Sequence, residues 1–279
     1  MLKIPLTVPQ KKAAEYLKNI TSLSQNRICF SIADKLTHLN ELFYNDDIPE
    51  ECNFPGHLFT VSRHKAVTAM ITHLGLISRY AKEHPDITYI VQLNGNTVLT
   101  ADEPIAKTLH SVRDVVQFKK ETNCTIAGVS YTIFLGSEHE PSMLAAAAQH
   151  IMHAHEHGLV AILTVYPRIS QSHESDSSVI AGGCGIANAL GADIVISPVP
   201  SGKTSAQRAA NFKQAIRAAG NTKVVGFDMV KRENEEFLQE VSALISISGL
   251  SGIAVDHALF QQSKKDFAQF CDKIAKALL

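Results

Sequence analysis

The chain of 279 residues carries 26 basic and 27 acidic side chains, and this balance gives no bulk attraction to nucleic acid or to an anionic membrane surface. Hydrophobic residues make up 45% and charged residues 19%, which excludes intrinsic disorder and allows a large buried core. No apolar run approaches the roughly 18 residues of a membrane-spanning helix, and the start lacks a signal-peptide profile. The five cysteines form no CxxC pair, as expected for reduced thiols in a cytoplasmic protein.

Eight apolar, β-branched segments recur along the chain, and most lack polar alternation, which is typical of strands buried on both faces. The predicted strands are 28–33, 58–62, 87–93, 125–133, 159–166, 193–199, 223–229 and 252–256. Helical periodicity predicts an N-terminal helix over about 10–24 and further helices between the strands. These further helices are expected at about 64–82, 104–121, 141–157, 176–190, 204–219, 233–247 and 264–278.

Local signals support several of these helix ends. Asp102-Glu103-Pro104 and Glu140-Pro141 combine acidic residues with a proline, as helix starts do. Gly158, Gly191 and Gly220 follow predicted helices, where a left-handed cap favours a residue without a Cβ.

Eight strands, each followed or nearly followed by a helix, predict an α/β protein that folds as one (β/α)8 TIM barrel over residues 1–279, with an extra N-terminal helix. An open doubly wound sheet is the alternative. In a barrel, the irregular segment 35–56 becomes a long loop at the carboxyl end of the strands, where active sites lie.

Three motifs are open to more than one interpretation. Gly202-Lys203-Thr204 resembles part of a phosphate-binding loop, but the prolines before it remove backbone N–H groups, which favours a rigid loop and a helix cap at Thr204 or Ser205. Gly182-Gly183-Cys184-Gly185 lacks a third dinucleotide-type glycine and indicates close helix packing.

Histidines 150, 153, 155 and 157 gather at one helix end, where they complement the helix dipole; a surface metal site is the alternative, and we assign no metal.

Polar residues at the carboxyl ends of the predicted strands are the best site candidates, because that end of a barrel faces the reaction chamber. They are Asp34, Gln92, Asn94, Tyr131, Tyr166, Asp228, Asp256 and His257. A carboxylate, a phenol and an imidazole that converge on one pocket could perform general acid–base catalysis. Capping of loops by some of these side chains is the alternative.

Five segments carry a pattern that is shared with a known family: 127–138, 154–159, 165–168, 189–195 and 252–255. Through these segments the chain resembles the archaeal-type class I fructose-bisphosphate aldolases, within the deoxyribose-phosphate aldolase-like barrel group. The resemblance implies a lyase of the class I aldolase type that uses no cofactor. In the family, a strand-six lysine forms a Schiff base with a carbonyl substrate, a strand-five tyrosine acts as general acid–base, and glycine-rich turns after strands seven and eight hold phosphate.

Residue by residue, Tyr166 matches the catalytic tyrosine and Asp34 matches an aspartate that assists proton transfer. The lysine has no match, because the family reads Gly-Ala-Asp-x-x-Lys and this chain reads Gly191-Ala-Asp-Ile-Val-Ile196. Where the family has a Ser-Gly-Gly turn after strand seven, this chain has Phe227-Asp228-Met229. Where the family has Gly-Arg after strand eight, this chain has Asp256-His257. Carboxylates near a phosphate dianion repel it by roughly several kcal/mol at an effective dielectric near 20, so we expect the pocket to reject phosphate.

Two classes of function follow from these replacements. A divergent enzyme could use the remaining acids, Tyr166 and His257 for acid–base steps, could hold a divalent cation with the acids, or could recruit another amine. The amines that could reach in from top-face loops are Lys35, Lys65, Lys203 and Lys231. Alternatively, the chain is a non-catalytic homologue for binding or for assembly into the homo-oligomers that such relatives form. We expect a small carbonyl ligand and little or no cleavage of fructose 1,6-bisphosphate.

Overall fold

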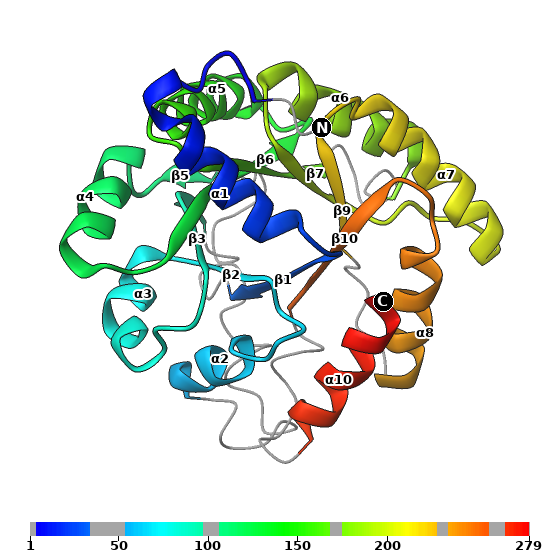
Figure 1. The fold of residues 1–279 in the computed structure, drawn as a ribbon. Helices are drawn as coiled ribbons and strands as arrows, with labels where there is room; N and C mark the ends of the chain where they lie inside the picture. Colours follow the sequence, from blue (N-terminus) through cyan, green and yellow to red (C-terminus); the bar gives the residue numbers. More distant parts are fainter. Residues whose placement is uncertain are drawn as a thin grey trace.

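The computed structural model describes residues 4–33, 54–96, 106–167, 175–227, 234–256 and 266–278. Eight parallel strands form a closed barrel in the order β1-β10-β9-β8-β7-β6-β3-β2 (Figure 1). The strands are β1 Ile28–Ala33, β2 Ala69–Thr72, β3 Tyr89–Gln92, β6 Ile126–Leu135, β7 Val160–Pro167, β8 Ile194–Pro198, β9 Lys223–Phe227 and β10 Leu250–Val255. The closed order confirms the TIM-barrel prediction over the open sheet.

Helices surround the barrel on its outside (Figure 1). They are α2 Pro55–Ser62, α3 Leu74–Tyr80, α4 Val112–Thr122, α5 Glu140–Glu156, α6 Ser177–Leu190, α7 Ser205–Ala218, α8 Asn234–Ile245 and α10 Phe267–Leu278. Short 3-10 turns occupy Gln10–Lys12 and Ala81–Glu83, and the first of them leads into the N-terminal helix α1, Ala13–Ser24. This helix is present as predicted.

The second strand was predicted in the wrong place. The segment 58–62 lies inside α2, and the barrel strand is Ala69–Thr72, within the predicted helix 64–82. Both segments are short buried apolar runs, so periodicity alone does not separate them. Pro55 occupies the first turn of α2, where a missing N–H costs nothing.

The predicted helix 104–121 also begins later than expected. Residues Lys107–Thr108 form strand β5, which pairs antiparallel with β4, Asn94–Gly95. Helix α4 starts after Ser111, whose hydroxyl accepts from the Asp114 N–H at 3.2 Å while the Asp114 carboxylate accepts from the Ser111 N–H at 2.8 Å. This capping box sets the helix start, whereas the sequence Asp102–Pro104 lies outside the described residues.

The other predicted helix ends are confirmed. Helix α5 begins at Glu140 with a proline in its first turn. Gly158, Gly191 and Gly220 have φ of 73°, 89° and 59°, the left-handed conformation expected of C-terminal caps.

The apolar side chains form two clusters. An outer core lies between the strands and the surrounding helices, and an inner core fills the barrel with side chains such as Phe30, Ile90 and Ile162. Tyr16, Ile20 and Leu23 of α1 also belong to the inner core and are almost fully buried. Helix α1 therefore closes the amino end of the barrel, which we call the floor.

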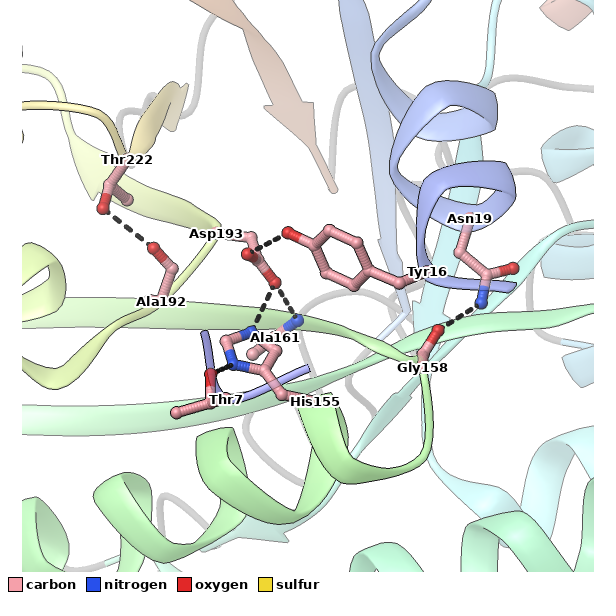
Figure 2. A network of polar contacts seen from close by, with 9 residues as sticks. All are labelled: Thr7, Tyr16, Asn19, His155, Gly158, Ala161, Ala192, Asp193 and Thr222. Atoms are coloured by element: carbon pink, nitrogen blue, oxygen red, sulfur yellow. Dashed lines mark hydrogen bonds and ion pairs between the residues drawn. The ribbon is translucent and has the colours of Figure 1, made fainter. Parts of the chain in front are cut away.

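A polar network joins α1 to the amino ends of the strands at the floor (Figure 2). The Tyr16 hydroxyl donates to Asp193 Oδ1 at 2.5 Å, and Asp193 Oδ2 accepts from the Ala161 N–H at 2.8 Å. His155 Nε2 lies 3.0 Å from the same oxygen, and its Nδ1 lies 2.6 Å from Thr7 Oγ1. Burial and the neighbouring negative charge of Asp193 raise the pKa of Tyr16, so its hydroxyl remains a donor.

Candidate functional site

The site lies at the carboxyl end of the barrel strands, which we call the chamber. The strand register aligns inward-facing residues of β6, β7, β8 and β9 in two rows. The upper row consists of two register pairs, Phe134 with Tyr166 and Pro198 with Phe227, joined by the ring contact of Tyr166 with Phe227. The lower row consists of Thr132, Thr164, Ile196 and Val225. None of these eight side chains carries a formal charge at neutral pH, so these two rows form a neutral wall.

Ile196 occupies the middle of the lower row. Its side chain is 0% exposed and belongs to the inner core, with Thr164 beside it on β7 and Val225 beside it on β9. An aliphatic side chain supplies no nucleophile. Among the lysines of the described ranges, none is buried.

Tyr166 lies at the end of β7 and is half-buried. Its ring stacks on Phe134 with ring centres 5.9 Å apart and planes inclined by 25°. Phe227 meets it edge-on, with ring centres 6.3 Å apart and planes inclined by 80°. Tyr166 packs against both the inner and the outer core, so aromatic contacts on two sides fix the orientation of its ring.

Gln92 and Asn94 lie together beside the lower row. Gln92 Nε2 donates to Asn94 Oδ1 at 2.8 Å and to Thr132 Oγ1 at 3.0 Å. Asn94 Nδ2 donates to the carbonyls of Thr132 and Ala106 at 2.8 and 3.0 Å, and Asn94 Oδ1 accepts from the Thr132 N–H. Asn94 is completely buried and its amide is used by these backbone partners, so it joins β6 to the segment before β5 and does not face a ligand.

Tyr131 does not line the chamber. Alternate residues of a strand face opposite sides, and Tyr131 lies between the inward-facing positions 130 and 132. Its ring packs in the outer core against His150 of α5, with ring centres 5.1 Å apart. Burial raises the pKa of Tyr131 and lowers that of His150, so both rings are neutral at pH 7.

The remaining candidates divide by position. Asp256 directly follows β10 and is buried. Asp34, Lys35, Asp228, Lys231 and His257 lie outside the described residues.

The two described alternative amines lie in different places. Lys203 is exposed on the segment between β8 and α7, at the carboxyl end of the barrel. Lys65 precedes β2, is 79% exposed and forms an ion pair with Asp272 at 3.4 Å. A loop that leads into a strand lies at the amino end of the barrel, so the expectation that Lys65 reaches in from a top-face loop is wrong. That expectation arose because the second strand was predicted at 58–62, before Lys65, whereas it lies at 69–72, after Lys65.

The structure also decides the three ambiguous motifs. The Thr204 hydroxyl accepts from the Gln207 N–H at 3.1 Å and caps α7. Gly183 lies inside α6, where a Cβ would come within 3.0 Å of Leu135, so close packing explains this glycine, whereas a Cβ at Gly182 would meet nothing within 4 Å. His155 is engaged by Asp193 and Thr7, and among the described residues no three His, Cys, Asp or Glu side chains gather as a metal site.

Thr132 and Thr164 were missed as site residues by sequence reasoning. The signal that could have found Thr164 is its position two residues before Tyr166, and Thr132 follows from its pairing with Thr164. Thr164 stands two residues before Tyr166 on the same strand and so shares its face, and Thr132 pairs with Thr164 in the register. Threonine is common in strands, so this spacing alone did not mark them.

Comparisons with known proteins identify the family. Residues 55–262 match the model of the DeoC/LacD family aldolases. The fructose-bisphosphate aldolase/6-deoxy-5-ketofructose 1-phosphate synthase of Methanocaldococcus jannaschii is 37% identical over 278 residues, covering 98% of this chain and 89% of that protein. This chain belongs to the DeoC/LacD aldolase family.

Further relatives agree with this assignment. A class 1 fructose-bisphosphate aldolase of Halobacterium salinarum is 29% identical over 211 residues, which is 75% of each chain. The solved structure of a fructose-bisphosphate aldolase from Slackia heliotrinireducens superposes with a TM-score of 0.93 at 32% identity, covering 100% of this chain and 90% of that one. No helix in the described part of this family member has the length and apolarity to cross a membrane.

Proposed function

We propose that this chain is an aldolase-family barrel that has lost the Schiff-base step at strand six and binds a non-phosphorylated carbonyl compound in its chamber. It cleaves fructose 1,6-bisphosphate poorly or not at all. The observation that carries the proposal is Ile196, a fully buried aliphatic side chain at the position where the family sequence pattern has lysine.

Schiff-base formation requires an unprotonated amine within reach of the substrate carbonyl. An amine in water is protonated at neutral pH, and desolvation is what makes a lysine nucleophilic in such sites. Because no lysine of the described ranges is buried, none of them provides the desolvated amine that the family mechanism needs.

The sequence around the chamber also supports a ligand without phosphate. Asp228 and Asp256 stand where the family pattern has a glycine-rich turn and a Gly-Arg turn. Asp256 is buried, so its negative charge would be only weakly screened from a neighbouring dianion. Together, an inert residue 196 and acidic residues at the two sequence positions of the phosphate turns favour a neutral carbonyl ligand over a sugar bisphosphate.

Borohydride trapping tests the loss of the Schiff base. The protein is incubated with dihydroxyacetone phosphate and sodium borohydride, and its intact mass is measured. We expect no reduced adduct above the level of a sample without the ketone, and fructose 1,6-bisphosphate cleavage well below the ordinary enzyme rate of about 1 per second.

The Methanocaldococcus jannaschii relative, treated in parallel, serves as the positive control for trapping conditions. A stoichiometric adduct on this chain would overturn the proposal. Peptide mapping would then identify the lysine, with Lys35, Lys203 and Lys231 as the first positions to examine. Cleavage at or above about 1 per second would overturn it equally.

A further inference from the structure

We propose that the chamber recognises a neutral ligand that combines a flat aromatic ring with a carbonyl oxygen. The ring would lie against Tyr166, and the oxygen would accept a hydrogen bond from the Thr164 hydroxyl. This inference rests on the proposed function and specifies its substrate class.

The first support is the upper row of the chamber. Phe134 pairs with Tyr166 and Pro198 pairs with Phe227 in the strand register, and the Tyr166 ring contacts the rings of both Phe134 and Phe227. Phe134 and Phe227 are buried, whereas Tyr166 between them is only half-buried. Aromatic rings held in this way favour stacked or edge-on contact with another ring and offer no charge to a phosphate or a carboxylate.

The second and independent support is the hydroxyl of Thr164. The residue is 6% exposed, and its side chain makes no hydrogen bond within the described ranges. The other two buried threonines behave differently: Thr72 donates to the Ala33 carbonyl at 2.9 Å, and Thr222 donates to the Ala192 carbonyl at 2.8 Å. A hydroxyl on the chamber face without a partner among the described residues is available to donate a hydrogen bond to a ligand acceptor.

The two features belong to one surface. Thr164 and Tyr166 are alternate residues of β7, so their side chains face the same side with about 6.6 Å between their Cα atoms. Ile196, beside Thr164, adds apolar surface where the lysine of the family pattern would have placed a charge. A small aromatic ketone can therefore contact the ring, the hydroxyl and the aliphatic side chain together.

Ligand-observed NMR titration tests this assignment with three probes. Acetophenone is the aromatic ketone, cyclohexyl methyl ketone has the same size without the aromatic ring, and dihydroxyacetone phosphate is the phosphorylated ketone. We expect acetophenone to bind at least about fivefold more tightly than cyclohexyl methyl ketone, since aromatic contacts add to area burial. Dihydroxyacetone phosphate should bind more weakly than acetophenone.

Substitutions separate the two contacts. Thr164→Val keeps the shape of the side chain and should weaken acetophenone binding about five- to tenfold through loss of one hydrogen bond. Tyr166→Leu should weaken it about tenfold, and the conservative Tyr166→Phe should restore most of that loss because the ring remains. Thr122→Val, the same change at an exposed end of α4, is the matched control, and circular dichroism checks that each variant is folded.

Three results would overturn the inference: no binding of acetophenone, tighter binding of dihydroxyacetone phosphate, or equal weakening by Thr164→Val and Thr122→Val. The two proposals fail separately. A trapped borohydride adduct contradicts the loss of the Schiff base without any measurement on acetophenone. Failed acetophenone binding with no trapped adduct leaves the loss of the Schiff base intact.

Discussion

Asp193 joins three distant segments through one buried carboxylate. It accepts from Tyr16 of α1 and from the backbone N–H of Ala161 on β7, and it contacts His155 at the end of α5. The sequence placed Asp193 at the start of a strand but gave no indication of Tyr16 as its partner, because the two residues are 177 positions apart. Long-range polar pairs of this kind leave no periodic trace in a sequence.

Whether a side chain faces the inside of the barrel could be predicted for some site residues and not for others. Ile196 belongs to the inner core and Tyr166 packs against it. Tyr131 was predicted to line the pocket only because it stands near a strand end. The long strand β6 continues to Leu135, so the carboxyl end of this strand lies further along the chain than predicted.

The cysteines allow a prediction about thiol reactivity. Burial raises the pKa of Cys29 and Cys271 to about 12 and that of Cys184 to about 11, so these thiols stay protonated at pH 8. Cys124 is only partly buried. With iodoacetamide at pH 8, peptide mass mapping should find Cys124 modified well before these three. The same reagent in 6 M guanidinium chloride is the control, since all should react there. Fast alkylation of Cys29 in the native protein would contradict the prediction.

At the scale of elements, β10 and β1 approach each other closely at Gly252. A Cβ built there would lie 2.0 Å from the Ile28 carbonyl oxygen, which is backbone and cannot move aside. The residue pairs with Ile28 in the parallel register that completes the ring of strands. Closure of the barrel at this seam therefore depends on the absence of a side chain.

Paired glycine substitutions test this dependence. Gly252→Ala should lower the free energy of unfolding by at least about 3 kcal/mol, because the added methyl group must displace a strand. Gly182→Ala is the matched control: Gly182 is exposed on α6 with nothing within 4 Å of the built Cβ, so the change should stabilise the protein by about 0.5–1 kcal/mol. Urea denaturation measures both. Similar effects of the two substitutions would contradict this account of the seam.

The number and type of elements could largely be predicted, but one strand–helix exchange could not. Segments 58–62 and 69–72 are both short and apolar, and only tertiary packing decides that the first becomes the buried helix α2 and the second the strand β2. This one exchange also misplaced Lys65 at the wrong end of the barrel. An error in one element thus passed directly into the candidate site.

For the whole molecule, α1 is as much a part of the barrel as the strands are. Its apolar side chains belong to the inner core, while Lys12 and Lys119 of α4 both pair with Glu15, at 2.6 and 3.0 Å. Asn19 donates to the Gly158 carbonyl at 2.8 Å. The sequence predicted the helix but not its position, because apolar periodicity does not reveal which surface a helix covers.

Truncation of one α1 side chain measures its contribution. Ile20 is 1% exposed in the inner core, so Ile20→Ala should reduce the free energy of unfolding by about 2–5 kcal/mol. Lys18→Ala, an exposed change on the same helix, should alter it by less than about 0.5 kcal/mol. Urea denaturation followed by circular dichroism gives both values. A cost for Ile20→Ala as small as that of Lys18→Ala would show that α1 is not part of the cooperative unit.

The sealed floor has a practical meaning for experiments on this protein. Because α1 covers one mouth of the barrel, the ligand that we propose would enter at the opposite mouth. The chain segment that leads into α1 lies at the closed side, held there through Thr7. Attachment to a sensor surface through the N-terminus should therefore leave the ligand entrance turned toward solution.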